Sequence, residues 1–430
     1  MTARDAALRA LTACRKSGAW SDAALKETLR GMDRREAALA SRLCYGVLQN
    51  RMLLDYWLAG FTRLERLQPV VHDILRLAIY QLTLTDKIPA SAAVNEAVEQ
   101  TKRFANPQAA RLVNAVLRSV TRTQALPQPQ EPALKYSHPA ELISLLEHQY
   151  GREKTVALLK SHNEAPQTVL QVNRLRATAQ ETAEALTASG VECAPHPWLP
   201  DCLTVRGTGS MEQLPAFQKG LCYVQDAAAR LAVYAAGLEP GMRVLDCCAA
   251  PGGKSFAAAI DMHNRGSLIS CDIHVHKLGL IERGAQRLGI DILRTRLQDA
   301  SAPVPQWQDA MDAVLADVPC SGLGVIRKKP DIRYKDLKQT ESLQQLQLAI
   351  LSQQAQYVRR GGVLLYSTCT ILRRENEDVV EAFLRENPDY EPEAVRFPEG
   401  SGIPCGAMTT LLPCDHGTDC FFICKLRRKL

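Results

Sequence analysis

The sequence predicts a multidomain protein with an all-α N-terminal domain, a small α+β subdomain and an α/β domain that contains a parallel, doubly wound sheet. Three observations support this prediction. Apolar residues recur at helical spacing over residues 1–123, a proline-rich stretch covers residues 124–132, and short β-rich runs alternate with helical stretches from about Gly241 onward. A chain of 430 residues has room for all three domains.

Residues 1–123 are expected to form a helical domain. Ile74, Leu77 and Ala78 recur at helical spacing, and Ser91 after Pro89 is typical of a capped helix start. This region contains 19 basic and 11 acidic residues, whereas the remainder of the chain contains 33 and 35. The concentrated positive charge indicates a polyanionic partner such as nucleic acid, although a well-solvated helical surface would have the same composition.

The prolines at positions 127, 129 and 132 predict a linker over residues 124–132. Residues 133–238 then mix two patterns. Helical spacing appears near Leu142 and again over 181–188, and strand-like runs appear at 168–173 and 203–205. We therefore expect a small α+β subdomain here.

Residues 239–430 alternate between strand and helix patterns, which predicts a parallel sheet covered by helices. The strand candidates are 243–246, 267–272, 292–297, 313–317 and 363–367, and the helix candidates are 255–260, 277–288 and 337–357. The glutamine-rich helix around Leu343, Leu346 and Ile350 is expected to pack on the sheet. Ligands of such sheets bind beyond the carboxyl ends of the strands.

A glycine-containing turn follows the first of these strands. It consists of Cys248, Ala249, Ala250, Pro251, Gly252, Gly253 and Lys254. Glycines allow a ligand to approach backbone N–H groups, and the N-terminus of the following helix favours a carboxylate or phosphate. The spacing is neither that of a dinucleotide loop nor that of a P-loop, and a plain tight turn would look the same.

Polar side chains follow the next strands. Asp272 stands where a carboxylate can accept both ribose hydroxyls of an adenosine, and Asp299 could meet the adenine amino group. Aspartates also cap helices and begin turns, so each alone is weak evidence. The last two strands end in Asp317 with Cys320 and in Cys369. Two thiols and a carboxylate at one sheet edge indicate covalent catalysis.

The motifs of this domain resemble those of the RsmB/Nop2/NSUN family of RNA cytosine-5 methyltransferases. The matching segments are 244–254, 317–324 and 366–370, together with 327–331, Gln225-Asp226, and Asp272-Ile273-His274 with Lys277 and 287–289. The N-terminal third resembles the NusB-type RNA-binding module in segments 33–35, 43–48, 94–98 and 113–118. The combination is similar to the bacterial RsmB type, which modifies 16S rRNA.

The resemblance implies S-adenosylmethionine as methyl donor and a Rossmann-like class I methyltransferase domain. It implies that Cys369 is the nucleophile that attacks carbon 6 of the cytosine, that Cys320 helps to release the product, and that Asp317 contacts ring N3. The methyl donor would be held by the turn at 248–254, by Asp272 and Asp299, and by the backbone around Asp317.

RNA contacts are expected from Arg327, Lys328 and Lys329, and from Arg174 and Arg176 in the α+β subdomain, which is expected to bind RNA as well. A solvated loop is the alternative for the first three, but phosphate contact is favoured because this loop is expected to border the catalytic crevice. The expected partner is 16S rRNA, with no membrane contact and a monomeric chain. The N-terminus lacks an apolar core run, so we expect a cytoplasmic location and free thiols at the 14 cysteines.

Three departures from the family pattern are visible, since Cys247, Cys414 and Cys420 replace an aliphatic residue and two glycines. Strain is expected at the last two if those positions need positive φ. A zinc site built from the C-terminal cysteines and His416 is not expected, because their spacing matches no Cys-x-x-Cys pair. The alternative functions are a tRNA or DNA cytosine methyltransferase and a non-catalytic RNA-binding or assembly factor.

Overall fold

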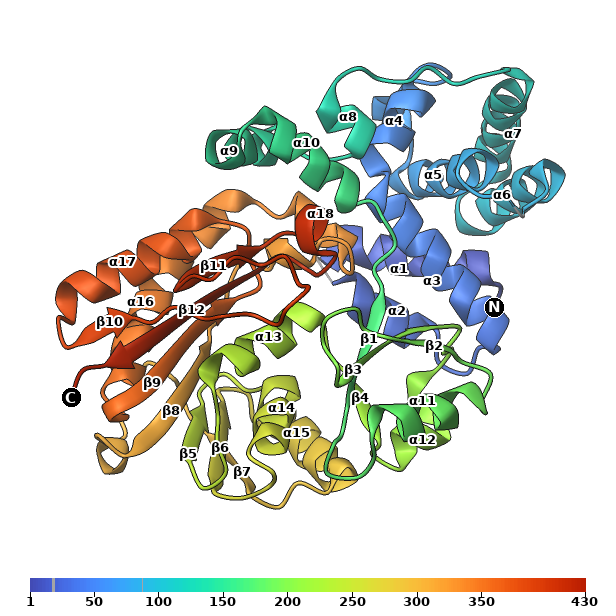
Figure 1. Ribbon diagram of the computed structural model, residues 1–430. Coiled ribbons are helices and arrows are strands. Elements are labelled where there is room, and N and C mark those ends of the chain that lie inside the picture. The colour runs from blue at the N-terminus through green and yellow to red at the C-terminus, as the bar shows by residue number, and fades with distance from the viewer. Residues whose placement is uncertain (18–19, 87) are drawn as a thin grey trace. The chain divides into compact units, whose positions relative to one another are not determined.

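The computed structural model describes residues 1–17, 20–86 and 88–430, and the chain forms two compact units (Figure 1). The first unit comprises Met1–Glu164 and Ile326–Lys335, and the second comprises Ala165–Val325 and Asp336–Leu430. The first unit thus includes α9 and α10, which the sequence suggested as the start of the second domain, and a short segment that lies much later in the sequence.

The first unit is helical, as predicted. Its helices are α1 (Ala3–Ser17), α2 (Ser21–Thr28), α3 (Arg34–Gln49), α4 (Arg51–Ala59), α5 (Pro69–Thr83), α6 (Ala90–Phe104), α7 (Pro107–Arg122), α8 (Pro132–Tyr136), α9 (Ala140–Tyr150) and α10 (Arg152–Ser161). Side-chain caps at Asp33 and Asn106 begin α3 and α7. The expected cap at Ser91 is wrong, because α6 begins at Ala90 after Pro89 without a side-chain cap.

The proline-rich stretch packs on this helical unit through its backbone. The Trp57 indole N–H donates to the carbonyl of Pro127 at 2.8 Å.

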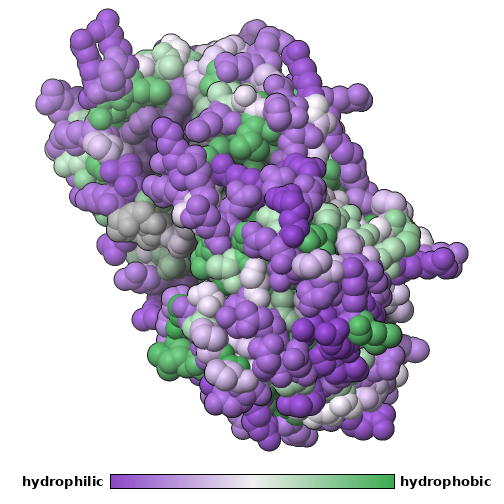
Figure 2. Space-filling model, turned by 90° about the vertical axis from the view of Figure 1, so that its left-hand side faces the viewer, coloured by the Kyte–Doolittle hydropathy of each residue, from purple (hydrophilic) through white to green (hydrophobic). Residues whose placement is uncertain are grey.

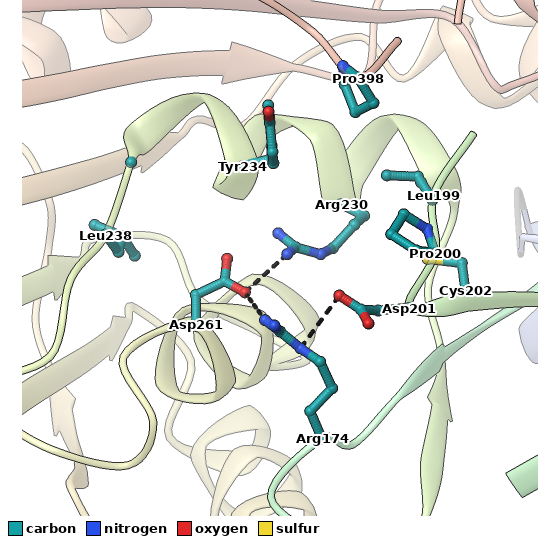
Figure 3. Close-up of a pocket in the computed structure, with 11 residues that line it drawn as sticks. Arg174, Leu199, Pro200, Asp201, Cys202, Arg230, Tyr234, Leu238, Asp261 and Pro398 are labelled. Atoms are coloured by element: carbon teal, nitrogen blue, oxygen red, sulfur yellow. Dashed lines mark hydrogen bonds and ion pairs between the residues drawn. The ribbon is translucent and has the colours of Figure 1, made fainter. Parts of the chain in front are cut away.

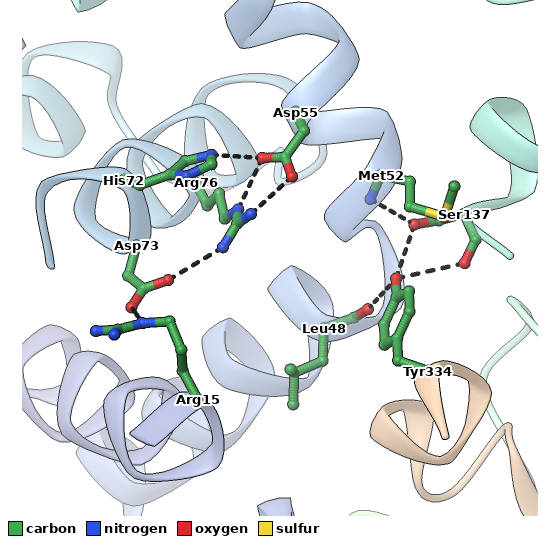
Figure 4. A network of polar contacts seen from close by, with 9 residues as sticks. All are labelled: Arg15, Leu48, Met52, Asp55, His72, Asp73, Arg76, Ser137 and Tyr334. Carbon is green, nitrogen blue, oxygen red and sulfur yellow. Dashed lines mark hydrogen bonds and ion pairs between the residues drawn. The ribbon is translucent and has the colours of Figure 1, made fainter. Parts of the chain in front are cut away.

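A network of ion pairs joins helices of the same unit. The Asp55 carboxylate accepts from both His72 and Arg76, and Arg76 and Arg15 both contact Asp73 (Figure 4). Most of these side chains are largely buried, so their charges are paired in the way that buried ions require.

The segment Ile326–Lys335 completes the helical unit. Its short helix η5 (Pro330–Tyr334) lies against α3, and the Tyr334 hydroxyl donates to the carbonyl of Leu48 and contacts the Ser137 hydroxyl (Figure 4). Arg333 is almost fully buried and donates to the Gln49 carbonyl at 2.9 Å and to Asn163 Oδ1 at 2.8 Å. Burial lowers the pKa of Arg333 to about 10.

Replacing Arg333 by alanine is expected to destabilise the helical unit by about 3 kcal/mol, because it leaves buried acceptors without donors and opens a cavity. Urea unfolding of the full chain measures the change. Arg63→Ala is the control: Arg63 is an exposed arginine of the same unit, so this variant should remain within about 0.5 kcal/mol of wild type. Equal stability of the two variants would contradict this role of Arg333.

The second unit begins with the predicted α+β subdomain. Its antiparallel sheet has the order β2-β3-β1-β4, with β1 (Thr168–Val172), β2 (Glu192–Pro195), β3 (Cys202–Arg206) and β4 (Cys222–Val224). Helices α11 (Ala179–Thr187) and α12 (Pro215–Gln218) cover it. A capping box between Thr178 and Glu181 begins α11.

The larger sheet of this unit has the strand order β10-β12-β9-β8-β5-β6-β7, with β11 paired to β12. Its strands are β5 (Arg243–Asp246), β6 (Ser267–Asp272), β7 (Leu293–Leu297), β8 (Met311–Asp317), β9 (Val358–Thr368), β10 (Tyr390–Pro392), β11 (Met408–Leu411) and β12 (Phe421–Arg428). The five strands from β7 to β9 are parallel, as predicted, whereas β12 runs antiparallel to β9. The sheet is therefore mixed.

Helices cover both faces of this sheet. Val244 and Leu315 pack with α13 (Ala227–Ala236), α14 (Gly253–Asp261) and α15 (Val275–Leu288) on one face. Leu245 and Val314 pack with α16 (Leu343–Ala355) and α17 (Glu377–Glu386) on the other (Figure 1). Because neighbouring residues of one strand alternate between the two clusters, the predicted Rossmann-like three-layer architecture is confirmed.

The face drawn in Figure 2 is largely hydrophilic, and its hydrophobic residues form separate patches among hydrophilic ones. Within residues 1–17, 20–86 and 88–430, no helix combines the length and apolar character that crossing a bilayer requires.

Candidate functional site

The turn after β5 leads directly into α14 and is tightly packed. Gly252 stands at the N-cap of α14 with φ +111°, a conformation that favours glycine. A Cβ at this position would lie 2.5 Å from the Phe256 ring. The Ala249 N–H donates to the Cys271 carbonyl of the neighbouring strand at 2.7 Å. The turn is thereby fixed to the sheet and leaves the first N–H groups of α14 available to an anion.

A buried carboxylate lies beside this turn. Asp246, the last residue of β5, accepts a hydrogen bond from the Ser255 hydroxyl at 2.7 Å, and Ser255 in turn contacts Ser270. Its Oδ1 atom has no hydrogen-bond partner in the described chain. Burial raises the pKa of Asp246 to about 6. Asp246 is not among the site residues predicted from the sequence, although it ends the first predicted strand of the α/β domain.

Asp272 and Asp299 both follow strands of this sheet edge. Asp272 is mostly buried, and its Oδ1 accepts from the backbone N–H of His274 at 2.9 Å. The apolar side chains of Ile273 and Val275 next to it are exposed by 59% and 68%. Asp299 is exposed, and hydrogen bonds from Ser301 lower its pKa. Asp299 therefore has local partners within its own turn.

The two predicted catalytic cysteines lie next to each other. Their sulfur atoms are 3.3 Å apart, and both side chains are partly exposed. Lys254 Nζ lies 2.7 Å from Asp317 Oδ2, and the Ser367 hydroxyl donates to Asp317 Oδ1 at 2.8 Å. The turn after β5 and the ends of β8 and β9 thus bring two thiols, a carboxylate and an ammonium group to one sheet edge.

The electrostatics of this cluster favour a reactive Cys369. A hydrogen bond from the Cys320 thiol, assisted by the charge of Lys254, lowers the pKa of Cys369. The same hydrogen bond raises the pKa of Cys320. Burial alone would lower the pKa of Lys254, but the neighbouring Asp317 carboxylate has the larger combined effect, so the pKa of Lys254 is raised. Of the two thiols, Cys369 is therefore the one that ionises more readily.

This arrangement predicts the pH dependence of alkylation. A lowered pKa means that Cys369 is a thiolate at lower pH, so its reaction with iodoacetamide should have a midpoint below the value of about 8.5 of an ordinary thiol. Cys320→Ala removes the donor and is expected to raise that midpoint. Peptide mass spectrometry at each pH separates Cys369 from the other cysteines. A midpoint unchanged by the substitution would contradict the assigned hydrogen bond.

The residues around the turn suit an S-adenosylmethionine molecule. The cradle at Gly252 has no room for a side chain, the N-terminus of α14 suits a carboxylate, and Asp272 offers acceptors beside the exposed apolar Ile273 and Val275. A nucleoside with a carboxylate tail presents complementary groups. The residues present therefore fit this group.

The two arginines predicted to contact RNA from the α+β subdomain make ion pairs and hydrogen bonds within the second unit. Arg174 contacts Asp201 at 3.2 Å and Asp261 at 2.7 Å, and it lines a cavity of about 450 Å³ (Figure 3). Arg230 shares Asp261 with it. Arg176 donates to the carbonyls of Leu288 and Lys219. An RNA phosphate at Arg174 would compete with two carboxylates.

The basic triplet Arg327, Lys328 and Lys329 belongs to the segment that completes the helical unit. Lys329 makes an ion pair with Asp22 at 2.9 Å, and both side chains are about half exposed. Asp331 in the same segment accepts from the backbone N–H and the hydroxyl of Ser21. Contact of the triplet with RNA remains a prediction.

The C-terminal cysteines do not show the backbone strain that was expected if their positions needed positive φ. In the described part of the chain, no cluster of three or more His, Cys, Asp or Glu side chains could hold a metal ion. The non-glycine residues with positive φ there are Ser137, His263, Asn264 and Asp309, so Cys414 and Cys420 are not strained in this way. Cys247 is buried and lies next to Cys248, with 3.8 Å between their sulfur atoms.

Three further polar residues near the cysteines were not selected from the sequence. Gln347, Glu375 and Asn376 are fully buried, and their side chains contact the two cysteine-bearing loops. Gln347 lies on the glutamine-rich helix that was interpreted as packing alone. The signal for Gln347 is the burial of its polar side chain, and that burial depends on the fold.

Comparison with protein families agrees with this architecture. Residues 233–427 match the family described as 16S rRNA methyltransferase RsmB/F, residues 1–122 match the NusB family, and residues 138–212 match the ferredoxin-like domain described as Methyltr_RsmF/B-like. These matches extend over the predicted helical, α+β and α/β regions.

Curated relatives match over most or nearly all of the chain. The chain is 37% identical to the probable ribosomal RNA small subunit methyltransferase B of Bacillus subtilis (strain 168), over 99% of this chain and 98% of the relative. It is 34% identical to the ribosomal RNA small subunit methyltransferase B of Vibrio cholerae, over 83% of this chain and 82% of the relative.

Solved structures share the fold. The crystal structure of PH0851 superimposes with a TM-score of 0.82 at 25% identity and covers 98% of each chain. The structure of NSun6 from Pyrococcus horikoshii has a TM-score of 0.60 at 23% identity, over 67% of this chain and 98% of that one.

Proposed function

Because the chain belongs to the RsmB/F family of 16S rRNA methyltransferases, we propose that it transfers a methyl group from S-adenosylmethionine to carbon 5 of a cytosine in 16S rRNA. The resemblance points to the cytosine-967 type site. The observation that supports this chemistry most directly is the pair of thiols 3.3 Å apart beside the Lys254–Asp317 ion pair.

Carbon 5 of cytosine is a weak nucleophile, and a covalent step makes it reactive. The Cys369 thiolate adds to carbon 6, so that electron density moves to carbon 5 and to ring N3. When bound, the cosubstrate supplies an electrophilic methyl group that carbon 5 can attack. The turn at 248–254 and the carboxylates of Asp272 and Asp299 hold it in this proposal, with the backbone around Asp317.

Charge at ring N3 must be stabilised while Cys369 is bonded to the base. Asp317 is the residue proposed to contact N3 as the proton donor, and the ammonium group of Lys254, which contacts the Asp317 side chain, adds positive charge on that side. After methyl transfer, a base removes the proton from carbon 5 and the bond to Cys369 breaks. The Cys320 thiol, which contacts the Cys369 sulfur, is the group proposed to assist this release.

The target base must leave its stack to reach two sulfur atoms at a sheet edge. Extrusion costs a few kcal/mol and least for an unpaired base, so we expect a cytosine in a loop. The helical unit, whose sequence carries the excess of basic residues, is proposed to hold folded RNA during this step. The triplet at 327–329 and Arg174 and Arg176 remain candidates for phosphate contacts.

The test is methyl transfer from labelled S-adenosylmethionine to protein-free 16S rRNA, 23S rRNA and tRNA, and to isolated small ribosomal subunits. Mass spectrometry identifies the modified base. The expected result is 5-methylcytosine in 16S rRNA, either free or within the subunit, and none with the Cys369→Ala variant. Label in tRNA alone would refute the substrate, and no label in any RNA would favour a non-catalytic binding factor.

A further inference from the structure

The residues on either side of Cys320 are held by two buried side chains. Gln347 on α16 donates through Nε2 to the carbonyl of Pro319 at 2.9 Å. The Glu375 carboxylate accepts from the backbone N–H of Ser321 at 2.8 Å and from Gln347 Nε2 at 3.0 Å. The backbone is therefore fixed immediately before and immediately after the thiol.

The residues on either side of Cys369 are held in a corresponding way. Asn376 donates through Nδ2 to the carbonyl of Thr370 at 3.1 Å, and its Oδ1 accepts from the Thr368 hydroxyl at 2.5 Å. The hydroxyls of Ser321 and Thr370, which follow the two cysteines, are 2.6 Å apart. Since Glu375 and Asn376 are consecutive, one dipeptide links both cysteine loops.

The burial of this cluster makes its geometry rigid. Gln347, Glu375, Asn376, Thr368 and Thr370 are all 0% exposed. Water cannot replace a lost partner there, so each hydrogen bond restricts the loops more strongly than an exposed one would. The end of η7 (Arg373–Glu375) is anchored as well, because the Tyr366 hydroxyl donates to the Glu375 carbonyl at 2.6 Å.

We propose that Gln347, Glu375 and Asn376 are positioning residues that set the separation of the two thiols, with Gln347 and Glu375 acting on Cys320 and Asn376 on Cys369. This proposal rests on the proposed roles of the two cysteines and deepens them. Of the two thiols, only Cys369 must be in place for nucleophilic attack, whereas release also needs Cys320 within reach of the same sulfur. The two halves of the cluster therefore act on different steps.

The alternative is that these polar groups merely satisfy one another. Gln354 provides a matched control, because its side chain is also a buried polar group on the same helix. It lies on the same helix as Gln347, is 1% exposed, and donates through Nε2 to the Ala300 carbonyl at 2.7 Å. Both glutamines also leave Oε1 without a hydrogen-bond partner among the described residues. Gln354 differs in having no contact with a cysteine loop, so Gln347→Ala and Gln354→Ala should cost similar stability.

The first experiment measures thiol geometry without RNA. The full-length protein is equilibrated with a mixture of reduced and oxidised glutathione. Oxidised glutathione accepts two electrons and two protons from the two thiols, so that the Cys320–Cys369 disulfide forms and two molecules of reduced glutathione are released. Peptide mass spectrometry quantifies that disulfide and gives the effective concentration of the two thiols. Gln347→Ala is expected to lower it at least about tenfold and Gln354→Ala no more than about twofold. Equal values for the two variants would overturn the proposal.

Glu375 is tested in the same assay by two substitutions. Glu375→Ala should also lower the effective concentration, whereas Glu375→Gln keeps an oxygen that can face the Ser321 N–H and should restore most of it. If Glu375→Ala does not fold, the comparison of Gln347→Ala with Gln354→Ala still tests whether these side chains set the thiol separation. If both variants fold and have the same effective thiol concentration, Glu375 does not position the Cys320 loop through its side chain.

The second experiment uses 16S rRNA and separates attack from release. Gln347→Ala should increase the fraction of enzyme in a denaturation-resistant RNA adduct, and Asn376→Ala should decrease it. Parallel losses in both variants would overturn the division of roles. If wild type does not methylate RNA and Cys320→Ala forms no adduct, the proposed function fails, while the thiol measurement still reports on positioning.

Discussion

Replacing Cys369 by alanine is expected to abolish methyl transfer, whereas replacing Cys320 by alanine is expected to trap the enzyme on its RNA. Without a nucleophile at position 369, carbon 5 is never activated, and the rate should fall by roughly 1,000-fold or more. Cys320→Ala keeps the nucleophile and removes the thiol that lies 3.3 Å from it. Attack then proceeds and release is slow, so an adduct accumulates.

Gel electrophoresis under denaturing conditions, with labelled 16S rRNA, measures the adduct directly. Cys424→Ala is a suitable control, because Cys424 is a fully buried thiol of the same sheet with no place in the proposed chemistry. It should behave as wild type in both assays. Equal adduct formation by Cys369→Ala and Cys320→Ala would refute the assignment of roles, and adducts formed only by Cys369→Ala would reverse it.

Breaking the Lys254–Asp317 ion pair is expected to have the next largest effect. Asp317→Asn and Lys254→Met should each reduce kcat by roughly 100- to 10,000-fold, because charge at ring N3 is no longer stabilised during attack. The effect should be larger on kcat than on the KM for RNA. In a Cys320→Ala background, Asp317→Asn should also prevent the adduct from forming.

Lys425 offers a matched control for this experiment. Its Nζ lies 2.7 Å from Glu393, as Lys254 Nζ does from Asp317, and the two lysine side chains are 12% and 15% exposed. Lys425→Met therefore removes a comparable ion pair from the same unit without touching the cysteine cluster. If it reduced kcat as much as Lys254→Met, the loss would reflect stability, and the proposed part of Lys254 in the chemistry would be wrong.

The domain classes and the main strand ends could be predicted from the sequence because they depend on local periodicity. Helical spacing identified the helical unit, and alternation of strands and helices identified the α/β sheet. The turn at 248–254, Asp317, Cys320 and Cys369 were found for the same reason, since each follows a predicted strand. The structure brings Lys254, Asp317 and both thiols together.

What could not be predicted depends on contacts between distant parts of the chain. Strand β12 lies between β9 and β10 and runs antiparallel to both. No local sequence pattern indicates this position or this direction. Gln347 and Glu375 look like ordinary polar surface residues in the sequence, and only the fold buries them beside Cys320. The docking of Ile326–Lys335 in the helical unit is of the same kind, since Arg333 meets Gln49 across nearly 300 positions of sequence.

That docked segment has a consequence for how the protein is made. Residues 1–164 leave the ribosome first, but the acceptors at Gln49 and Asn163 receive the Arg333 guanidinium only after residue 333 has been translated. During synthesis, the helical unit therefore lacks its last segment until more than a third of the polypeptide has been translated after residue 164. The helical unit reaches its final stability only when the cysteine loop at 320 already exists, so termination before residue 335 leaves that unit incomplete.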